Sequence, residues 1–376
     1  MTQEQPDQSL EEPWGHDGVA HLRELGRVPR AAGSAEEREA REYSAAVLRN
    51  LGFETSLESF SYSTFPGRYG TPVGGAIAAA TVVVTFWLVV IEGAVVAGSI
   101  AFGAGLLLLV LFVWSMLGDG VLELPWMRAE AHNLIARRGD APPRVWLVAH
   151  IDTKSQPLSS RIRLAGFALL LASVLLTAML LAVTLGTGST RTIPWMICVA
   201  LAVVGGRAVA GSVVRNLSPG AVDNASGVAA VLAAAALVDP TAAVAVLIPS
   251  AEELGLAGAR AWVRAHAGER AIVLNCDGVD DQGELTLMYT KTRPEPIVDA
   301  VQRIAGEVRV LRMPPGMLLD SVAFADAGWT TATLSHGSTK TLARVHTRRD
   351  ALDVLEGTQV DPMAWVLART SEALAR

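Results

Sequence analysis

Three long stretches of the sequence carry no charged residue, at positions 69–91, 93–118 and 164–190. Each exceeds the roughly 20 residues that a helix needs to cross the hydrocarbon core of a bilayer. A fourth stretch, 192–214, is interrupted by Arg207 near one end, where a long side chain can reach the membrane interface. We therefore expect four transmembrane helices. Buried core helices of a soluble protein are the alternative interpretation.

The four stretches come in two closely spaced pairs, which predict transmembrane hairpins at 71–118 and 161–214. A hairpin leaves and returns on one side of the membrane, so the rest of the chain shares one compartment. That remainder comprises an acidic, loose tail at 1–13 and one domain assembled from 14–70, 119–160 and 215–376.

The overall composition fits a membrane protein that also has a water-exposed domain, since 51% of the residues are hydrophobic and only 18% are charged. The net charge of -6 leaves no basic stripe to neutralise phosphates, which argues against a nucleic-acid-binding protein. Two cysteines cannot crosslink 376 residues, so a disulfide scaffold is excluded as well. The uncharged stretches contain almost no ionisable residue that could line a transport pathway, which disfavours a transporter.

Positive charges that flank the hairpins gather on the side of the domain. On that side are Arg68, Arg128, Lys154, Arg161, Arg163 and Arg215, whereas the far loops carry Glu92 and Arg191. Because positive residues accumulate on the cytoplasmic side, this distribution places the domain in the cytoplasm. The first residues lack the basic start and apolar core of a cleavable signal peptide. The sequence thus predicts a multi-pass protein of a bacterial plasma membrane.

Apolar strands alternate with helices in the domain. The expected strands are 54–62, 131–138, 144–149, 242–248, 271–276, 284–289, 308–311 and 330–334, and the expected helices are 34–50, 225–238, 254–266 and 295–305. Several strands are continuously apolar, as strands are when both faces of their sheet are buried. We therefore expect an α/β fold in which helices cover both faces of a mixed sheet.

Polar side chains follow three of the buried strands where each strand ends. They are His150 and Asp152 after the first, Glu252 and Glu253 after the second, and Asp277 after the third. Open α/β sheets place ligands at this edge, and imidazole and carboxylate groups are metal ligands. In a strand alternate residues share a face, so the Asp152 carboxylate can lie behind His150 and orient it. The two glutamates lie in a turn and can diverge, one towards a metal and the other towards its water.

These groups lie within motifs that resemble the co-catalytic di-zinc aminopeptidases, typified by bacterial leucine aminopeptidase and aminopeptidase Y. Glutamate carboxypeptidase belongs to the same family, and glutaminyl cyclase is a relative. The motifs are VAHID at 148–152, PGAVDNASGV at 219–228, AEELGLAG at 251–258, LNCD at 274–277, DSVAF at 320–324 and VHTRRD at 345–350. They run through the domain outside the hairpins, and the resemblance implies the zinc exopeptidase fold.

The resemblance implies a metal centre of two zinc ions. Asp223 would bridge the ions, and His150, Glu253, Asp277 and His346 would complete the two sites. The peptide bond after the bridging aspartate is often cis in the family. Five protein ligands around two ions leave room for a shared water, which a hydrolytic site needs.

The resemblance also implies roles for residues around the metals. Glu252 would be the general base, and Asp152 would orient His150. Asp320 and Ser321 fall where the family has a Ser–Asp pair near the substrate, although their order is reversed, and we predict that they contact the substrate.

Together these features predict a membrane-anchored zinc exopeptidase, most simply an aminopeptidase that hydrolyses short peptides. The alternatives are another amide hydrolase on the same metals, such as a carboxypeptidase, deacylase or glutaminyl cyclase, and a non-catalytic membrane scaffold. The second hairpin lies between His150 and Asp223, where the family has a short loop, so we expect the site and its peptide substrates to lie close to the bilayer. The sequence leaves the oligomeric state open.

Overall fold

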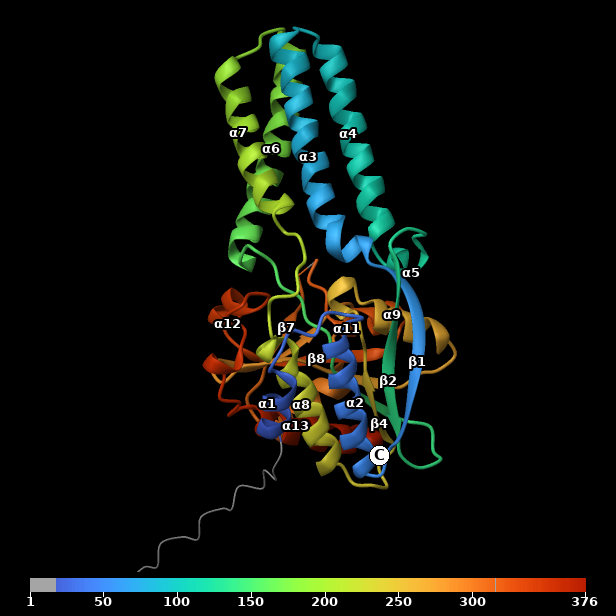
Figure 1. Cartoon of the computed structure of the whole chain (residues 1–376). Coiled ribbons are helices and arrows are strands. Elements are labelled where there is room, and N and C mark those ends of the chain that lie inside the picture. The colour runs from blue at the N-terminus through green and yellow to red at the C-terminus, as the bar shows by residue number, and fades with distance from the viewer. Residues whose placement is uncertain (1–17, 315) are drawn as a thin grey trace, which may run out of the picture.

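The computed structural model describes residues 18–314 and 316–376, so the tail expected at 1–13 lies outside the described residues. A bundle of long helices stands on a domain of strands and shorter helices (Figure 1). The chain passes from the domain into the bundle and back twice, through α3 and α4 and then through α6 and α7 (Figure 1).

Eight strands of the described chain form a mixed sheet in the order β1-β2-β4-β3-β5-β8-β6-β7. They are β1 (Glu54–Ser63), β2 (Arg128–Arg137), β3 (Val145–Val148), β4 (Val244–Ile248), β5 (Ile272–Val279), β6 (Glu284–Tyr289), β7 (Arg309–Arg312) and β8 (Thr330–Gly337). The central strands β4, β3, β5 and β8 run parallel. The pairs β1–β2, β2–β4 and β8–β6 are antiparallel, and the edge strand β7 pairs parallel with β6. The mixed sheet expected from the sequence is confirmed.

Helices cover both faces of this sheet. On one face lie α1 (Gly18–Leu25), α2 (Ala35–Asn50), α8 (Gly227–Leu237), α10 (Glu295–Ala305) and α13 (Val360–Ala375), and on the other lie α9 (Ala257–Ala265) and α11 (Asp320–Asp326). In β3, Val145 and Leu147 pack into the first layer, and Trp146 and Val148 pack into the second. This alternation follows from the two-residue period of a strand. The α/β architecture is therefore confirmed, with α1, α11 and α13 as helices that the sequence analysis did not predict.

Four helices in the described part of the chain are long and apolar enough to cross a membrane. They are Pro66–Ile91, which contains α3 (Thr71–Phe86) between two π-helical turns, α4 (Val95–Met116), α6 (Ser160–Thr187) and α7 (Thr192–Ala210). Large apolar side chains such as Trp114 and Ile193 are 75% and 73% exposed on their outer surfaces. An apolar surface of this extent is typical of a helix bundle that contacts lipid rather than water.

Small residues allow α6 and α7 to pack closely. A Cβ atom added at Gly205 of α7 would lie 2.7 Å from the carbonyl oxygen of Gly166 and 2.8 Å from the backbone nitrogen of Leu170, both in α6. Neither backbone atom can move independently of its helix. Small residues at such contacts are characteristic of helices that associate within membranes.

Substitution Gly205→Val is therefore expected to push α6 and α7 apart. Overpacking of this kind costs about 1–3 kcal/mol, which a lower thermal unfolding midpoint in detergent would reveal. Gly186→Val is the matched control. Gly186 lies in α6, the helix that packs against α7, but a Cβ atom added there has no neighbour within 4 Å. Equal midpoints for the two variants would contradict close packing at Gly205.

Candidate metal centre

Three neighbouring parallel strands deliver side chains to one edge of the sheet. The segment after β3 carries His150 and Asp152, and a 3₁₀ turn after β4 (Glu252–Leu254) carries both glutamates. Asp277 lies within β5 itself, near its carboxyl end. The side chains of His150, Asp152, Glu252, Glu253 and Asp277 are all buried. The pairing of β3 with β4 and β5 thus brings together residues that are far apart in the sequence.

Two further segments complete the cluster. Asp223 lies at a kink with non-helical backbone dihedrals (φ -116°, ψ 89°) in the turn Ala221–Ser226 ahead of α8, and its peptide bond to Asn224 is cis, as the family resemblance implies. His346 follows α12 (Thr339–Arg344) and has a left-handed backbone conformation, with φ of 63°. The carboxylate of Asp350 accepts hydrogen bonds from the backbone nitrogens of Val222 (2.7 Å) and Asp223 (3.2 Å), which holds the turn in place.

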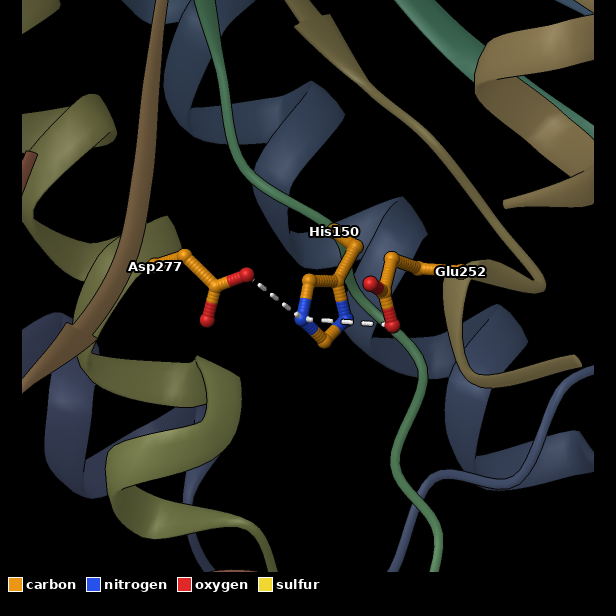
Figure 2. Close-up of side chains that lie close together, drawn as sticks. All are labelled: His150, Glu252 and Asp277. Atoms are coloured by element: carbon orange, nitrogen blue, oxygen red, sulfur yellow. Dashed lines mark ion pairs between the residues drawn. The ribbon is translucent and has the colours of Figure 1, made fainter. Parts of the chain in front are cut away.

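The side chains form two groups. Within each group the potential ligand atoms all lie within 4.8 Å of one another. In the first group, Nε2 of His150 is 3.7 Å from Oδ2 of Asp277 and 3.9 Å from Oε2 of Glu252. Figure 2 shows the imidazole of His150 lying between these two carboxylates. All three residues of this first group are buried.

The second group consists of Asp223, Glu253 and His346. Nε2 of His346 lies 2.8 Å from Oδ2 of Asp223 and 3.4 Å from Oε1 of Glu253. The other oxygen of Asp223, Oδ1, lies 3.3 Å from Nε2 of His150 in the first group. Asp223 therefore connects the two groups, one carboxylate oxygen facing each.

The donor set fits zinc. Nε2 of His150, Oδ2 of Asp277 and Oε1 of Glu253 are buried and have no hydrogen-bond partner in the described chain. Burying polar groups without partners is costly, and clustered carboxylates also repel one another unless a cation is present. Imidazole nitrogens and carboxylate oxygens together are the ligands that zinc prefers at catalytic sites.

Asp152 supports both sides of the first group. Its backbone carbonyl oxygen is 3.1 Å from Nδ1 of His150, and its carboxylate is 3.7 Å from the same nitrogen. The two carboxylate oxygens also accept hydrogen bonds from the backbone nitrogens of Glu252 (3.0 Å) and Glu253 (3.2 Å). Asp152 thus holds the turn that carries the two glutamates, and the orientation of His150 by its carboxylate remains a prediction.

Substitution Asp152→Asn is expected to reduce zinc affinity by about 10–100-fold, as is typical when a residue behind a metal ligand is lost. An amide retains only one acceptor oxygen, so one backbone nitrogen of the turn loses its partner. Competition with a chromophoric chelator would measure the change. Asp239→Asn is the matched control. Asp239 lies in an exposed turn far from the metal centre, and its carboxylate accepts a hydrogen bond from the backbone nitrogen of Thr241. Unchanged zinc affinity in Asp152→Asn would contradict this role.

The two adjacent glutamates have opposite electrostatic environments. Burial, together with the nearby carboxylates of Glu253, Asp320 and Asp277, raises the pKa of Glu252 well above its ordinary value despite the charge of His150. Burial would also raise the pKa of Glu253, but Lys154 and His346 outweigh it and lower that pKa to about 2. Paired carboxylates whose environments separate their pKa values are typical of sites that divide acid–base roles.

Asp320 and Ser321, the two predicted substrate contacts, differ in their hydrogen bonding. Asp320 is fully buried at the start of α11, and neither of its carboxylate oxygens has a hydrogen-bond partner in the described chain. Burial and the charge of Asp277 raise its pKa to about 7 although His150 opposes them. The hydroxyl of Ser321 lies 2.7 Å from that of Thr333 in β8, so it is engaged within the core. A substrate contact remains a prediction for both residues.

Three residues around the centre were not singled out from the sequence. Lys154 forms an ion pair of 2.5 Å with Oε2 of Glu253. Asp350 holds the turn that carries Asp223. Arg30 is buried and donates to the carbonyl oxygens of Ile151 (3.0 Å) and Pro219 (2.8 Å), which ties together the segments before and after the second hairpin. Asp350 belongs to the VHTRRD motif, the one signal that could have identified it.

Comparison with known proteins gives a family match and a set of shared folds. The model of peptidase family M28 matches residues 133–371, which include most of the site described above. No curated protein matches the chain significantly.

Several solved structures have the same fold. An aminopeptidase from Aneurinibacillus sp. strain AM-1 is 15% identical over 96% of this chain and 93% of its own, with a TM-score of 0.57. BSAP, a zinc aminopeptidase from Bacillus subtilis, is 14% identical over 94% of this chain and 93% of its own, with a TM-score of 0.54. A glutaminyl cyclase from Porphyromonas gingivalis is 16% identical over 94% of this chain and 96% of its own, also with a TM-score of 0.54. The zinc exopeptidase fold is thereby confirmed.

Proposed function

Because this chain belongs to peptidase family M28, we propose that it is a membrane-anchored zinc exopeptidase that removes amino-terminal residues from short peptides. The observation that carries the proposal is the position of Asp223, whose two carboxylate oxygens face the two groups of buried, unpartnered donor atoms. A shared carboxylate between two donor sets is the arrangement expected for a pair of co-catalytic metal ions.

In this proposal His150 and Asp277 hold one zinc ion, Glu253 and His346 hold the other, and Asp223 is shared. When bound, zinc lowers the pKa of water towards neutrality and polarises the carbonyl group of a scissile amide. Glu252 is left free as the general base, because Asp223 and Asp277 already supply the carboxylates around His150. Its carboxylate accepts a proton from the attacking water and returns it to the leaving amine. Asp152 keeps Glu252 in place by binding its backbone nitrogen.

We infer cleavage at the amino terminus from the aminopeptidases that share the fold. A glutaminyl cyclase shares the fold equally well, so cyclisation of amino-terminal glutamine is the second candidate.

A panel of unblocked, amino-blocked and glutaminyl peptides, incubated with detergent-purified protein and zinc, distinguishes these activities. We expect free amino acids to be released from unblocked peptides only. Release from amino-blocked peptides would instead indicate a carboxypeptidase or deacylase. Loss of ammonia from glutaminyl peptides without hydrolysis would indicate the cyclase. Stoichiometric zinc with no turnover of any peptide would favour a non-catalytic module.

We further propose that the four apolar helices cross a bacterial plasma membrane with the domain in the cytoplasm. Single cysteines introduced at Gly93, between the first two spans, and at Asp140, in a domain turn, test this topology. A membrane-impermeant thiol reagent applied to intact cells should label the first position and not the second. The native Cys198 and Cys276 are both buried, which keeps the background low.

The connections between domain and bundle favour substrates that reach the membrane face. Ser155 pairs with Arg215 just before α6 and just after α7, so the two connections run together between the bundle and the site. We therefore propose that apolar peptides released at the bilayer are the substrates. Replacing both hairpins by short linkers should then reduce activity on apolar peptides presented in membranes. Full retention of that activity would contradict the idea.

A further inference from the structure

Lysine is rare in this chain, and one lysine lies at the metal centre. Only three lysines occur, at positions 154, 291 and 340, among 31 basic residues. The side chain of Lys154 is 19% exposed, and its Nζ lies 2.5 Å from Oε2 of Glu253, a member of the second donor group. A fixed positive charge beside a metal ligand is unexpected, because it competes with the metal for the same carboxylate.

The two oxygens of Glu253 have different surroundings. Oε2 is engaged by Lys154, whereas Oε1 lies 3.4 Å from Nε2 of His346 and has no hydrogen-bond partner in the described chain. Oε1 is therefore the oxygen that remains for a metal ion, and Glu253 is held to a single ligating atom. Among the described residues, Glu253 is the only ion-pair partner of Lys154, and Lys154 forms no ion pair with Asp223.

The second donor group is also less well supported than the first. Nδ1 of His346 has no hydrogen-bond partner in the part of the chain that the structure describes, whereas Nδ1 of His150 lies 3.1 Å from the carbonyl oxygen of Asp152. The side chain of His346 is 19% exposed and that of His150 only 1%. A partner behind the imidazole fixes its orientation and strengthens its bond to metal. The second group lacks that support and lies closer to water.

We propose that Lys154 makes the second metal position, formed by Asp223, Glu253 and His346, a weak and exchangeable one, so that the first position fills alone at low zinc. This inference rests on the proposed function, since it assumes a centre for two ions. The ammonium group neutralises one of the two carboxylates of the second group, which lowers the attraction of that group for a divalent cation. The first group has no comparable basic partner among its ion pairs.

Removal of the lysine charge should therefore strengthen the second position. Without Lys154, Glu253 becomes a buried carboxylate with no ion-pair partner other than His346, which destabilises the metal-free centre. A zinc ion then relieves more repulsion when it binds. A lysine that served only to position Glu253 would have the opposite effect, because its loss would disorder a ligand and weaken zinc binding.

Zinc titration of the metal-free, detergent-solubilised full chain against a chromophoric chelator tests the inference. The wild type should bind two zinc ions in separate steps, with the second at least about tenfold weaker than the first. In Lys154→Met the second step should tighten by at least about tenfold, and the first should change by less than about twofold. Lys154→Arg keeps the charge and should retain the weak second step. Lys291→Met removes a lysine that pairs with Asp326 at the surface, and it should behave as the wild type.

Lys154→Gln serves as a second variant, and binding of the first zinc ion reports that the centre of either variant is folded. A second step that is unchanged or weaker in both the Met and Gln variants would overturn the inference. Two zinc ions of equal affinity in the wild type would overturn it while leaving the proposed function intact. A wild type that binds no zinc would instead refute the proposed function, and the inference with it.

Discussion

Replacement of Glu252 by glutamine is expected to lower kcat by about 10²–10⁴-fold, the contribution typical of a general base. Glutamine has nearly the same shape but cannot accept the proton of the attacking water. The backbone nitrogen of Glu252 would still donate to Asp152, so the turn should keep its conformation. Activity on unblocked peptides, measured beside the zinc content of the same preparation, would quantify the effect.

The zinc content distinguishes a base from a ligand at this position. Oε2 of Glu252 lies 3.9 Å from Nε2 of His150, within the same group of potential ligand atoms as Asp277. If Glu252 is the base, the glutamine variant should retain both zinc ions, whereas the matched variant Glu253→Gln should lose zinc from the second group. Loss of zinc from Glu252→Gln itself would assign Glu252 as a ligand and contradict its proposed role.

Complete removal of metal by a chelator is expected to abolish activity, and added zinc should restore it. The same treatment should lower the thermal unfolding midpoint, because each zinc ion present at a hundredfold excess over its Kd adds about 2.7 kcal/mol to the stability of the folded state. In the metal-free protein the buried donor atoms of His150, Asp277 and Glu253 are left without partners.

Substitution Asp223→Ala tests whether the two metal positions share this carboxylate. Because Asp223 faces both donor groups, its loss should weaken both positions, so that zinc neither restores activity nor raises the midpoint. Loss of only one zinc ion would show that the carboxylate is not shared. Full activity after exhaustive metal removal would contradict a zinc hydrolase altogether.

The elements that carry most of the centre could be predicted because each follows a simple physical pattern. The strands before His150 and Glu252 are continuously apolar, and parallel strands present their carboxyl ends at one edge of the sheet. The helix expected at 295–305 has the same bounds in the structure, as α10. The four long apolar helices could be predicted from the length and composition of the uncharged stretches alone.

Helix α13 shows where the sequence pattern was insufficient. Its buried face includes Thr370 and Ser371, both fully buried, so the apolar period that marks an amphipathic helix is interrupted. The hydroxyl of Ser371 donates to the carbonyl oxygen of Ala368, a contact within the helix that compensates for its burial. Such compensation becomes visible only when the backbone is known.

Contacts between distant segments account for the site residues that sequence analysis did not identify. The carboxylate of Asp350 binds the backbone nitrogen of Val222, a group that every residue type except proline possesses and that leaves no pattern in the sequence. Lys154 pairs with Glu253, which lies in a different segment of the chain beyond the second hairpin. From the sequence alone, Lys154 is recognisable only as one of the positive charges that flank a predicted transmembrane helix.

The insertion of α6 and α7 between His150 and Asp223 also fixes the order in which the protein can mature. A ribosome releases His150 before the hairpin and Asp223 after it, so the catalytic centre stays incomplete until both helices have been made and folded back. We therefore expect nascent chains that end before Asp223 to be inert, which ribosome-bound intermediates assayed for peptide hydrolysis would test. If these helices cross the membrane as proposed, the chain is already anchored before its metal centre can assemble.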